Sequence, residues 1–239
     1  MNPAALPRHA LLLWLGVLAA AGGGLIAARA PAWPVVLVWA PALCLAELFW
    51  IPTFGRRATL STAMVAHLAA AALLPAGQAL ALIAATALAA DLAVQRKPAV
   101  KALYNAALSV LAAGAAGLVF AGLHAAGGAG KPVAPLVALL AAAPVYWAVN
   151  RAGVTSIVCL AGGLPASRVW RDNFGFGYEF LVTAVETLLA GCLIVIWPAA
   201  GPLGLVAFAL PCFFINDSYR RRNQLEELRA RLREERRAA

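Results

Sequence analysis

The sequence of 239 residues is 63% hydrophobic and only 12% charged, and its mean hydropathy is +0.82. A soluble domain carries about 25% charged and ~45–50% apolar residues, so this chain cannot cover itself with polar surface. Eight of its 19 Lys and Arg residues lie from Arg220 to Arg237, so the net charge of +9 belongs mainly to the tail and the loops. Membrane proteins place such cations on the cytoplasmic side, and we therefore exclude nucleic acid as a partner.

Eight apolar segments follow one another along the chain, and each meets or approaches the ~20 residues that a membrane-spanning helix needs. Proline and glycine separate them, for example at Pro52 and at the tight turn from Pro75 to Gly77. The sequence therefore predicts an all-α, multi-pass helix bundle over residues 1–218 and a charged cytoplasmic juxtamembrane helix over 219–239. The predicted spans are 10–28, 33–52, 59–75, 77–95, 100–124, 132–160, 175–197 and 200–217.

The first of these segments has two interpretations. Arg8, the apolar run 10–28 and the triplet Ala28-Arg29-Ala30 have the layout of a signal peptide. The run is longer than the ~7–15 residues of a signal peptide's apolar region, which favours an uncleaved helix. Cleavage leaves seven helices and does not change the orientation of the others.

The basic residues of the loops predict the orientation of the bundle. Lys and Arg are enriched in cytoplasmic loops, and one missed or invented span inverts every later loop. With the N-terminus inside, the opposite side receives only Arg29 and Lys131. We therefore expect both termini to face the cytoplasm. The cytoplasmic side then receives the basic tail and Arg8, Arg56, Arg57, Arg96, Lys97, Lys101, Arg168 and Arg171.

Residues 167–178, between the sixth and seventh spans, have a different composition. They carry Arg168 and Arg171 beside Trp170 and Tyr178. Aromatic residues mixed with cations are typical of a segment at the level of the lipid headgroups. We expect this segment to lie along the cytoplasmic surface, as an anchor or as a gate or partner contact.

Polar residues inside the predicted spans are the best indication of a functional site, since a charge at mid-membrane costs about 2.5–3.5 kcal/mol on insertion scales. At 1.5 Å per residue, Arg151 and Glu186 both lie roughly 16 Å from the cytoplasmic side, which predicts an ion pair between neighbouring helices. Asn150 and Thr183 complete a hydrogen-bonded set. Four more residues lie at a depth of roughly 6–8 Å: Glu47, Asp91, Asn105 and Glu179.

Two interpretations of these residues stay open. They line a polar cavity that opens to the cytoplasm and binds a charged ligand or relays protons, or they form interhelical pairs that fix the packing. His67, on the third span, is either a ligand-binding residue or a packed histidine. Glu179 and Glu186 are seven residues apart and share a helix face. The candidate ligand-binding residues are Arg151, Glu186, Asn150, Glu179, Asn105, Glu47, Asp91 and His67.

No catalytic, cofactor or metal site is predicted. The sequence contains no His-Glu-x-x-His motif, no Gly-x-Ser-x-Gly elbow and no P-loop. The four cysteines lie singly in apolar runs, without the spacing of a zinc site or of a disulfide framework. These absences lower the expectation of an enzyme without excluding one.

The tail from Tyr219 onward has the pattern of a short charged helix. Leu225, Leu228 and Leu232 are spaced three and four residues apart, which is a seam of fewer than two heptads. Such a short seam cannot hold a dimer alone. The tail is therefore either a solvated helix whose cations meet anionic lipid or the start of a signalling helix that leads to a partner.

Five short stretches of polar and aromatic residues lie in order between about residues 40 and 220. They are Ala46-Glu47-Leu48-Phe49, Ala58-Thr59-Leu60-Ser61-Thr62-Ala63, Lys101-Ala102-Leu103-Tyr104-Asn105-Ala106-Ala107, Val145-Tyr146-Trp147-Ala148-Val149-Asn150 and Arg168-Val169-Trp170-Arg171-Asp172-Asn173-Phe174. This pattern resembles the multi-helix N-terminal membrane region of bacterial proteins whose cytosolic part is an HD-GYP phosphodiesterase or a GGDEF cyclase domain. The resemblance implies that Glu47, Ser61, Asn105, Asn150 and Trp170 are family positions, either structural or ligand-facing.

The 239 residues contain no HD, GYP or GGDEF motif, so we expect no cyclic-dinucleotide chemistry from them. The resemblance implies a sensory or ligand-binding module of the bacterial inner membrane. Its expected ligand is a small molecule or a lipid, and residues 219–239 are expected to contact a second copy or a cytosolic protein. The alternative is a small-molecule transporter or the substrate-capture subunit of one, such as those of vitamin importers. A lipid-modifying enzyme is a third hypothesis, without a motif to support it.

Overall fold

The computed structural model describes residues 32–48, 50–52, 59–127, 133–173 and 176–207, together with a few positions between 209 and 232. Within these residues the chain is all-α, as predicted, apart from one ribbon of two short strands. The strands β1 (Trp50–Pro52) and β2 (Thr59–Ser61) lie between α2 and α3 in the chain. The helices are α2 (Trp33–Leu48), α3 (Ala63–Leu73), α4 (Ala76–Ala89), the π-helix η2 (Ala90–Val94), α5 (Ala99–Ala126), α6 (Ala134–Gly162), α7 (Ala166–Asn173) and α8 (Phe176–Ala200).

Four helices of the described part are long and apolar enough to cross a membrane. They are Ala76–Val94, Ala99–Ala126, Ala134–Leu160 and Phe180–Ala200, with 19, 28, 27 and 21 residues. They coincide with the predicted spans 77–95, 100–124, 132–160 and 175–197. The predicted span 10–28 lies outside the described residues, and 200–217 is described only in part. The count of eight spans therefore stays a prediction.

The second and third predicted spans are shorter than expected. α2 has 16 residues and ends at Leu48, and α3 has 11 residues and begins at Ala63, because β1 and β2 occupy the facing ends of the two predicted segments. At 1.5 Å per residue α3 is roughly 16 Å long, about half the thickness of the hydrocarbon core. α3 is therefore too short to cross the membrane by itself.

The ribbon replaces helix where the sequence disfavours it. Pro52 lacks the backbone N–H that a helix interior needs and also restricts the residue before it, while Ile51 and Thr59 are β-branched. The strands are antiparallel, with the pairs Trp50↔Ser61, Ile51↔Leu60 and Pro52↔Thr59. The pairing provides hydrogen-bond partners for backbone groups that no helix satisfies here.

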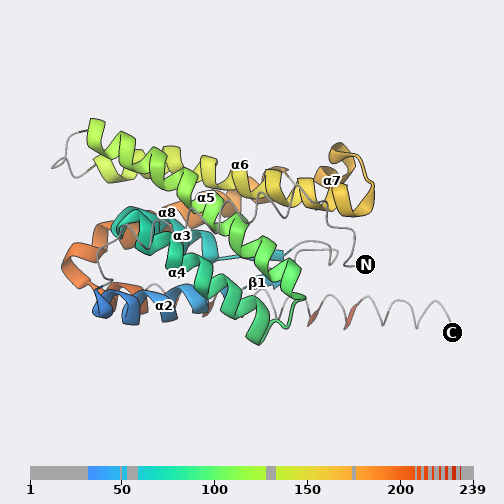
Figure 1. Cartoon of the computed structure of the whole chain (residues 1–239), viewed down its shortest axis with the longest axis horizontal. Coiled ribbons are helices and arrows are strands. Elements are labelled where there is room, and N and C mark those ends of the chain that lie inside the picture. Colours follow the sequence, from blue (N-terminus) through green and yellow to red (C-terminus); the bar gives the residue numbers. More distant parts are fainter. Residues whose placement is uncertain are drawn as a thin grey trace.

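α3 lies at the centre of the bundle, as Figure 1 shows, and packs against α2, α4, α5, α6 and α8. Every residue from Ala63 to Ala70 is buried, so α3 is covered around its whole circumference. Half of these residues are alanine, whose small side chain lets five helices approach one short helix closely. A polar side chain on α3 is therefore held inside the protein.

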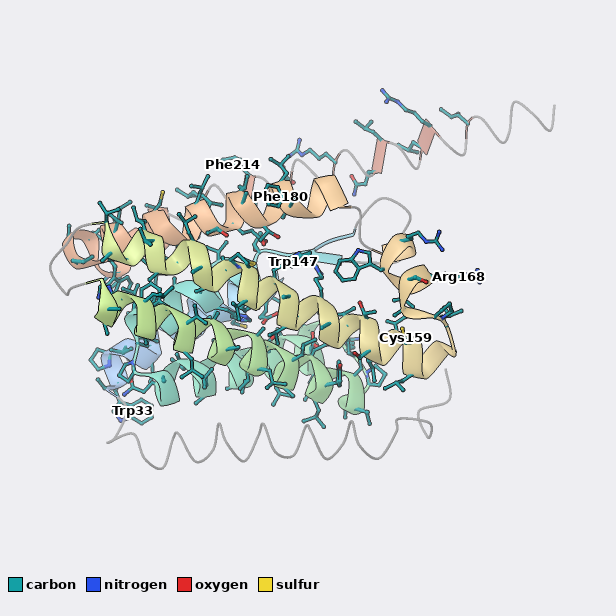
Figure 2. All side chains as sticks on the ribbon, turned by 90° about the horizontal axis from the view of Figure 1, so that it is seen from above. Trp33, Trp147, Cys159, Arg168, Phe180 and Phe214 are labelled. Atoms are coloured by element: carbon teal, nitrogen blue, oxygen red, sulfur yellow. The ribbon has the colours of Figure 1, made fainter. Side chains whose placement is uncertain are left out.

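The distribution of large side chains is that of a bundle surrounded by lipid. The buried core is mostly alanine, whereas Trp33, Leu118 and Phe180 are 71%, 78% and 76% exposed. Figure 2 shows Trp33, Phe180 and Phe214 on the outer surface of the bundle. Soluble monomers rarely expose apolar surface on this scale. Together with the four long apolar helices, this surface indicates a membrane protein.

Candidate functional site

The centre of the bundle holds a chain of three polar side chains from three helices. His67 on α3 is completely buried, and its Nδ1 lies 2.7 Å from the hydroxyl oxygen of Tyr146 on α6. Its Nε2 lies 3.1 Å from Oε1 of Glu47, next to the C-terminal end of α2. Tyr146 is 5% exposed, and the Glu47 side chain is 14% exposed. A carboxylate, an imidazole and a phenol therefore meet without bulk water.

The two contacts of His67 differ in kind. The contact with Tyr146 is a hydrogen bond. His67 Nε2 and Glu47 Oε1 lie close together, but neither atom makes a hydrogen bond of good geometry within the described part of the chain. Leaving a buried polar group without a hydrogen bond costs about 1–3 kcal/mol. Nε2 of His67, which faces Glu47, is therefore able to make a further hydrogen bond.

The order of the elements explains how a residue near the start of α3 comes to lie so deep. His67 is in the second turn of α3, and α3 begins only after the ribbon. The sequence predicts His67 at a depth similar to that of Arg151 and Glu186. The shortened α3 occupies the bundle interior, where α6 presents Tyr146 from the middle of its 29 residues.

Two more charged residues lie on the helices that surround these three side chains. α6 carries Arg151 five residues after Tyr146, and α8, which packs against both α3 and α6, carries Glu186. Glu186, on α8, is 7% exposed, and Arg151, on α6, is half-buried. Both are engaged in interactions within the structure. We call Glu47, His67, Tyr146, Arg151 and Glu186 the central cluster.

A second polar group lies at the turn between η2 and α5. Asp91 is 4% exposed and binds the Lys97 ammonium through Oδ1 at 2.6 Å. Asn105 Nδ2 donates to the other carboxylate oxygen at 2.7 Å. The backbone N–H of Lys97 also donates to the Asp91 carbonyl at 2.9 Å. Asp91 and Asn105, predicted at equal depth, are thus brought together, but in an arrangement whose evident role is to fix this turn.

Gln95 links the two groups. Its side-chain Nε2 donates to the backbone carbonyl of Glu47 at 3.3 Å, which ties the η2–α5 turn to the end of α2. Asn150 is half-buried on α6, beside Arg151. Glu179 belongs to α8, but its side chain lies outside the described residues. The predicted candidates therefore divide into the central cluster, the Asp91 turn and these two positions.

Sequence reasoning missed Tyr146 as a site residue. The tyrosine lies in an apolar stretch and carries no charge, so a search for charges in the membrane passes over it. The signal that could have found it is its spacing from Asn150, four residues away and on the same face of one helix. Its hydroxyl, once buried among apolar side chains, requires a partner.

The segment 167–178, whose position at the membrane surface stays a prediction, contains the short helix α7, and α7 turns one side toward the bundle. On α7, Val169 is 1% exposed, and the Trp170 ring packs edge-on against Trp147 of α6 at a centroid distance of 5.8 Å. Figure 2 shows Arg168 on the outer side of α7 and Trp147 on the inner side of α6. Arg171 is exposed as well. This is the geometry of a helix that rests on the end of the bundle with its cations outward.

The described residues contain no group of three or more His, Cys, Asp or Glu side chains that could hold a metal ion. Cys44, Cys159 and Cys192 are free thiols in this part of the chain. The central cluster has one imidazole and two carboxylates together with a guanidinium, and the guanidinium repels a cationic metal. The arrangement is better suited to hydrogen bonding with an organic ligand or to holding a proton.

Comparison with protein families, with curated proteins and with solved structures finds no match for this chain. The function is therefore argued from the central cluster itself.

Proposed function

We propose that the chain is a multi-pass membrane module that binds a small ligand at the central cluster and is not itself a catalyst. The observation that carries the proposal is the chain Glu47–His67–Tyr146, at 3.1 and 2.7 Å, inside a bundle with an apolar outer surface. Ionisable residues inside membrane bundles are costly and mark ligand or ion pathways. His67 Nε2 and Glu47 Oε1, which make no hydrogen bond of good geometry among the described residues, are the polar atoms that a ligand could bind.

If the module is a sensor, ligand binding must also be signalled to another protein. As proposed from the resemblance to membrane regions of HD-GYP and GGDEF proteins, the basic helix of residues 219–239 passes the state of the bundle to a second copy or a cytosolic protein. Trp147, next to Tyr146 in sequence, contacts Trp170 of α7. This contact supports a connection between the central cluster and the end of the bundle from which the tail is proposed to extend.

The proposed location is the bacterial inner membrane with both termini in the cytoplasm. The described cations support this orientation, because Arg96, Lys97 and Lys101 lie at the same end of the bundle as Arg168 and Arg171. Among the described residues at the opposite end, where α4 and α6 begin and α5 and α8 end, there is no Lys or Arg. Cations on one side only are typical of the cytoplasmic face.

Ligand co-purification tests the proposal. The chain is extracted in lipid nanodiscs, and the compounds released on denaturation are identified by mass spectrometry. We expect a small molecule to be enriched with the wild type and depleted with His67→Gln. The matched control is His124→Gln, since His124 stacks on Phe120 within α5 and lies outside the central cluster. Equal recovery from His67→Gln and His124→Gln, or no enriched compound, contradicts ligand binding at this site.

A transporter is the second candidate, favoured by the fact that the central cluster draws on four helices, α2, α3, α6 and α8. Residues shared between helices are where transporters bind their substrates. Removal of residues 219–239 separates the two hypotheses. A sensor loses its partner interaction and keeps its ligand, whereas a transporter keeps uptake in proteoliposomes and loses it with Arg151→Ala or Glu186→Gln.

A further inference from the structure

The lengths of the spans predict where α7 lies relative to the lipid headgroups. The span on α6 ends at Leu160 and the span on α8 begins at Phe180, so α7 lies in the connection between two spans. The α6 span has 27 residues, or roughly 40 Å at 1.5 Å per residue. A bilayer with its headgroups is about 40–45 Å thick. We therefore expect α7, which begins at Ala166, to lie at the level of the headgroups.

The contacts of α7 with the bundle determine which of its side chains point outward. Val169 is 1% exposed, and the Trp170 ring packs edge-on against Trp147 of α6 at 5.8 Å. Arg168 and Arg171 are both exposed, and residues three apart are neighbours on one face of a helix. Figure 2 shows Arg168 on the outer side of α7. The outer face of α7 therefore presents two guanidinium groups side by side.

These guanidinium groups suit the phosphate of a lipid headgroup. A guanidinium is a planar group with five N–H donors, and it binds phosphate oxygens in pairs. Nε of Arg171 donates to the backbone carbonyl of Ser167 at 3.3 Å, which uses one of these donors. Arg168 is also engaged within the protein and is nevertheless exposed. Binding a phosphate requires this exposure and does not require either side chain to lack contacts.

The charges around α7 favour a lipid with a net negative charge. Asp172 of α7 offsets one of its two arginines, and the same end of the bundle adds Arg96 and Lys101, both exposed. Among the described residues of the opposite end there is no Lys or Arg. Leu160 and Leu164, just before α7, are 47% and 37% exposed. Exposed apolar side chains followed by exposed cations match the order of acyl chain and headgroup in a phospholipid.

We propose that α7 binds anionic phospholipid, with Arg168 and Arg171 donating to the phosphate and the leucines before α7 contacting the acyl chain. A zwitterionic lipid is a poorer partner, because its headgroup brings a cation together with each phosphate. This binding surface is separate from the central cluster and does not depend on a ligand there.

A fluorophore beside α7 tests the inference. It is attached to Ala166→Cys in a background without the four native cysteines. The protein is reconstituted in phosphatidylcholine vesicles that contain increasing, small fractions of spin-labelled phosphatidylglycerol or spin-labelled phosphatidylcholine, which quench the fluorophore on contact. The fraction that halves the fluorescence should be about fivefold lower for phosphatidylglycerol, the ratio expected for one uncompensated cation near the surface. Added salt should reduce this ratio.

Two pairs of substitutions identify the residues that bind the lipid. Arg168→Gln combined with Arg171→Gln should abolish the difference between the two lipids without lowering the melting temperature, because both side chains are exposed. Arg168→Lys combined with Arg171→Lys keeps the charges and should retain part of the preference. The matched control is the same fluorophore on Ala126→Cys, exposed at the opposite end of the bundle, where we expect no preference.

Equal quenching by the two lipids beside Ala166 overturns the inference. A preference that survives in the double glutamine variant, or that is equally strong beside Ala126, overturns it as well. Quenching by neither lipid does the same, since α7 then lies outside the headgroup layer. A failure of ligand binding at the central cluster is seen separately, by co-purification with the wild type and with His67→Gln, and leaves these outcomes unchanged.

Discussion

The Tyr104 hydroxyl of α5 donates a hydrogen bond of 2.8 Å to the backbone carbonyl oxygen of Gly153 on α6. One turn further along α5, Leu108 packs directly on the same glycine. The two contacts join the two longest helices of the described part at the position where α6 has no side chain. Small residues at such positions let helices in lipid approach closely and expose backbone carbonyls to donors from the partner.

Gly153→Ala should destabilise the bundle. The added Cβ would collide with Cδ1 and Cδ2 of Leu108 and crowd its Cγ, so the buried Leu108 side chain must move or the two helices must separate. Overpacking of this kind typically costs about 1–3 kcal/mol. Thermal or denaturant unfolding in detergent measures the change, and Tyr104→Phe should add a loss of about 0.6 kcal/mol.

Gly122→Ala on α5 is the control for the same chemical change. An added Cβ there meets no atom within 4 Å, so no contact opposes it. Alanine has the higher helix propensity, by about 1 kcal/mol in a helix interior. We therefore expect this variant to be as stable as the wild type or more stable. A similar loss in both variants would show that close approach at Gly153 is not the cause.

The long apolar helices could be predicted from the sequence because length and hydropathy alone determine them. The ends of the second and third spans could not, since a short apolar strand and a helix segment have the same composition. The β-branched residues Ile51 and Thr59 disfavour a helix without excluding one, and the ribbon pairing decides between the two. The contacts of His67 depend on where α3 begins after that ribbon, so its partners could not be read from residue counting along a helix.

For the candidate site, the sequence indicated the charged residues but not their partners. The sequence predicts Glu47 in a layer near the membrane surface together with Asp91 and Asn105. In the structure Glu47 contacts His67, while Asp91 and Asn105 bind each other. Equal depth places residues in one layer of the membrane, but which of them meet depends on how the helices are arranged around α3.

The hydrogen bond between His67 and Tyr146 should appear as a coupling energy. Tyr146→Phe removes only the hydroxyl and leaves Nδ1 of a buried imidazole without its partner, which costs about 1–3 kcal/mol. In a His67→Leu background the same change should cost much less, because no polar partner remains. A double-mutant cycle from the unfolding free energies measures the difference. A coupling energy indistinguishable from zero would argue against this hydrogen bond.

Loss of Lys97 should be more damaging than loss of another lysine nearby. Lys97→Met removes the cation that binds the Asp91 carboxylate, whose side chain is 5% exposed. The remaining partner, Asn105, is neutral, so the carboxylate is left charged and only half compensated. Breaking a buried pair from one side costs about 3–5 kcal/mol, and the partial exposure of Lys97 places the expected loss at about 1–3 kcal/mol.

Lys101→Met provides the comparison for that variant. Lys101 lies exposed on the first turn of α5, where substitutions change stability by about 0.5 kcal/mol or less. Asp91→Asn combined with Lys97→Met should recover part of the loss, since no buried charge then remains. Equal losses for the two lysine variants, without recovery in the double variant, would contradict the ion pair.

The proposed orientation predicts which ends of the helices are accessible from each side of the membrane. Single cysteines at the exposed positions Ala99 and Ala166 mark the basic end, and cysteines at Ala76 and Ala126 mark the other end. The background lacks the native cysteines Cys44, Cys159, Cys192 and Cys212. A membrane-impermeant maleimide should label the first two only in inverted vesicles and the other two in intact spheroplasts. The reverse pattern contradicts a cytoplasmic basic end, and labelling of Ala99→Cys and Ala166→Cys from different sides contradicts the bundle itself.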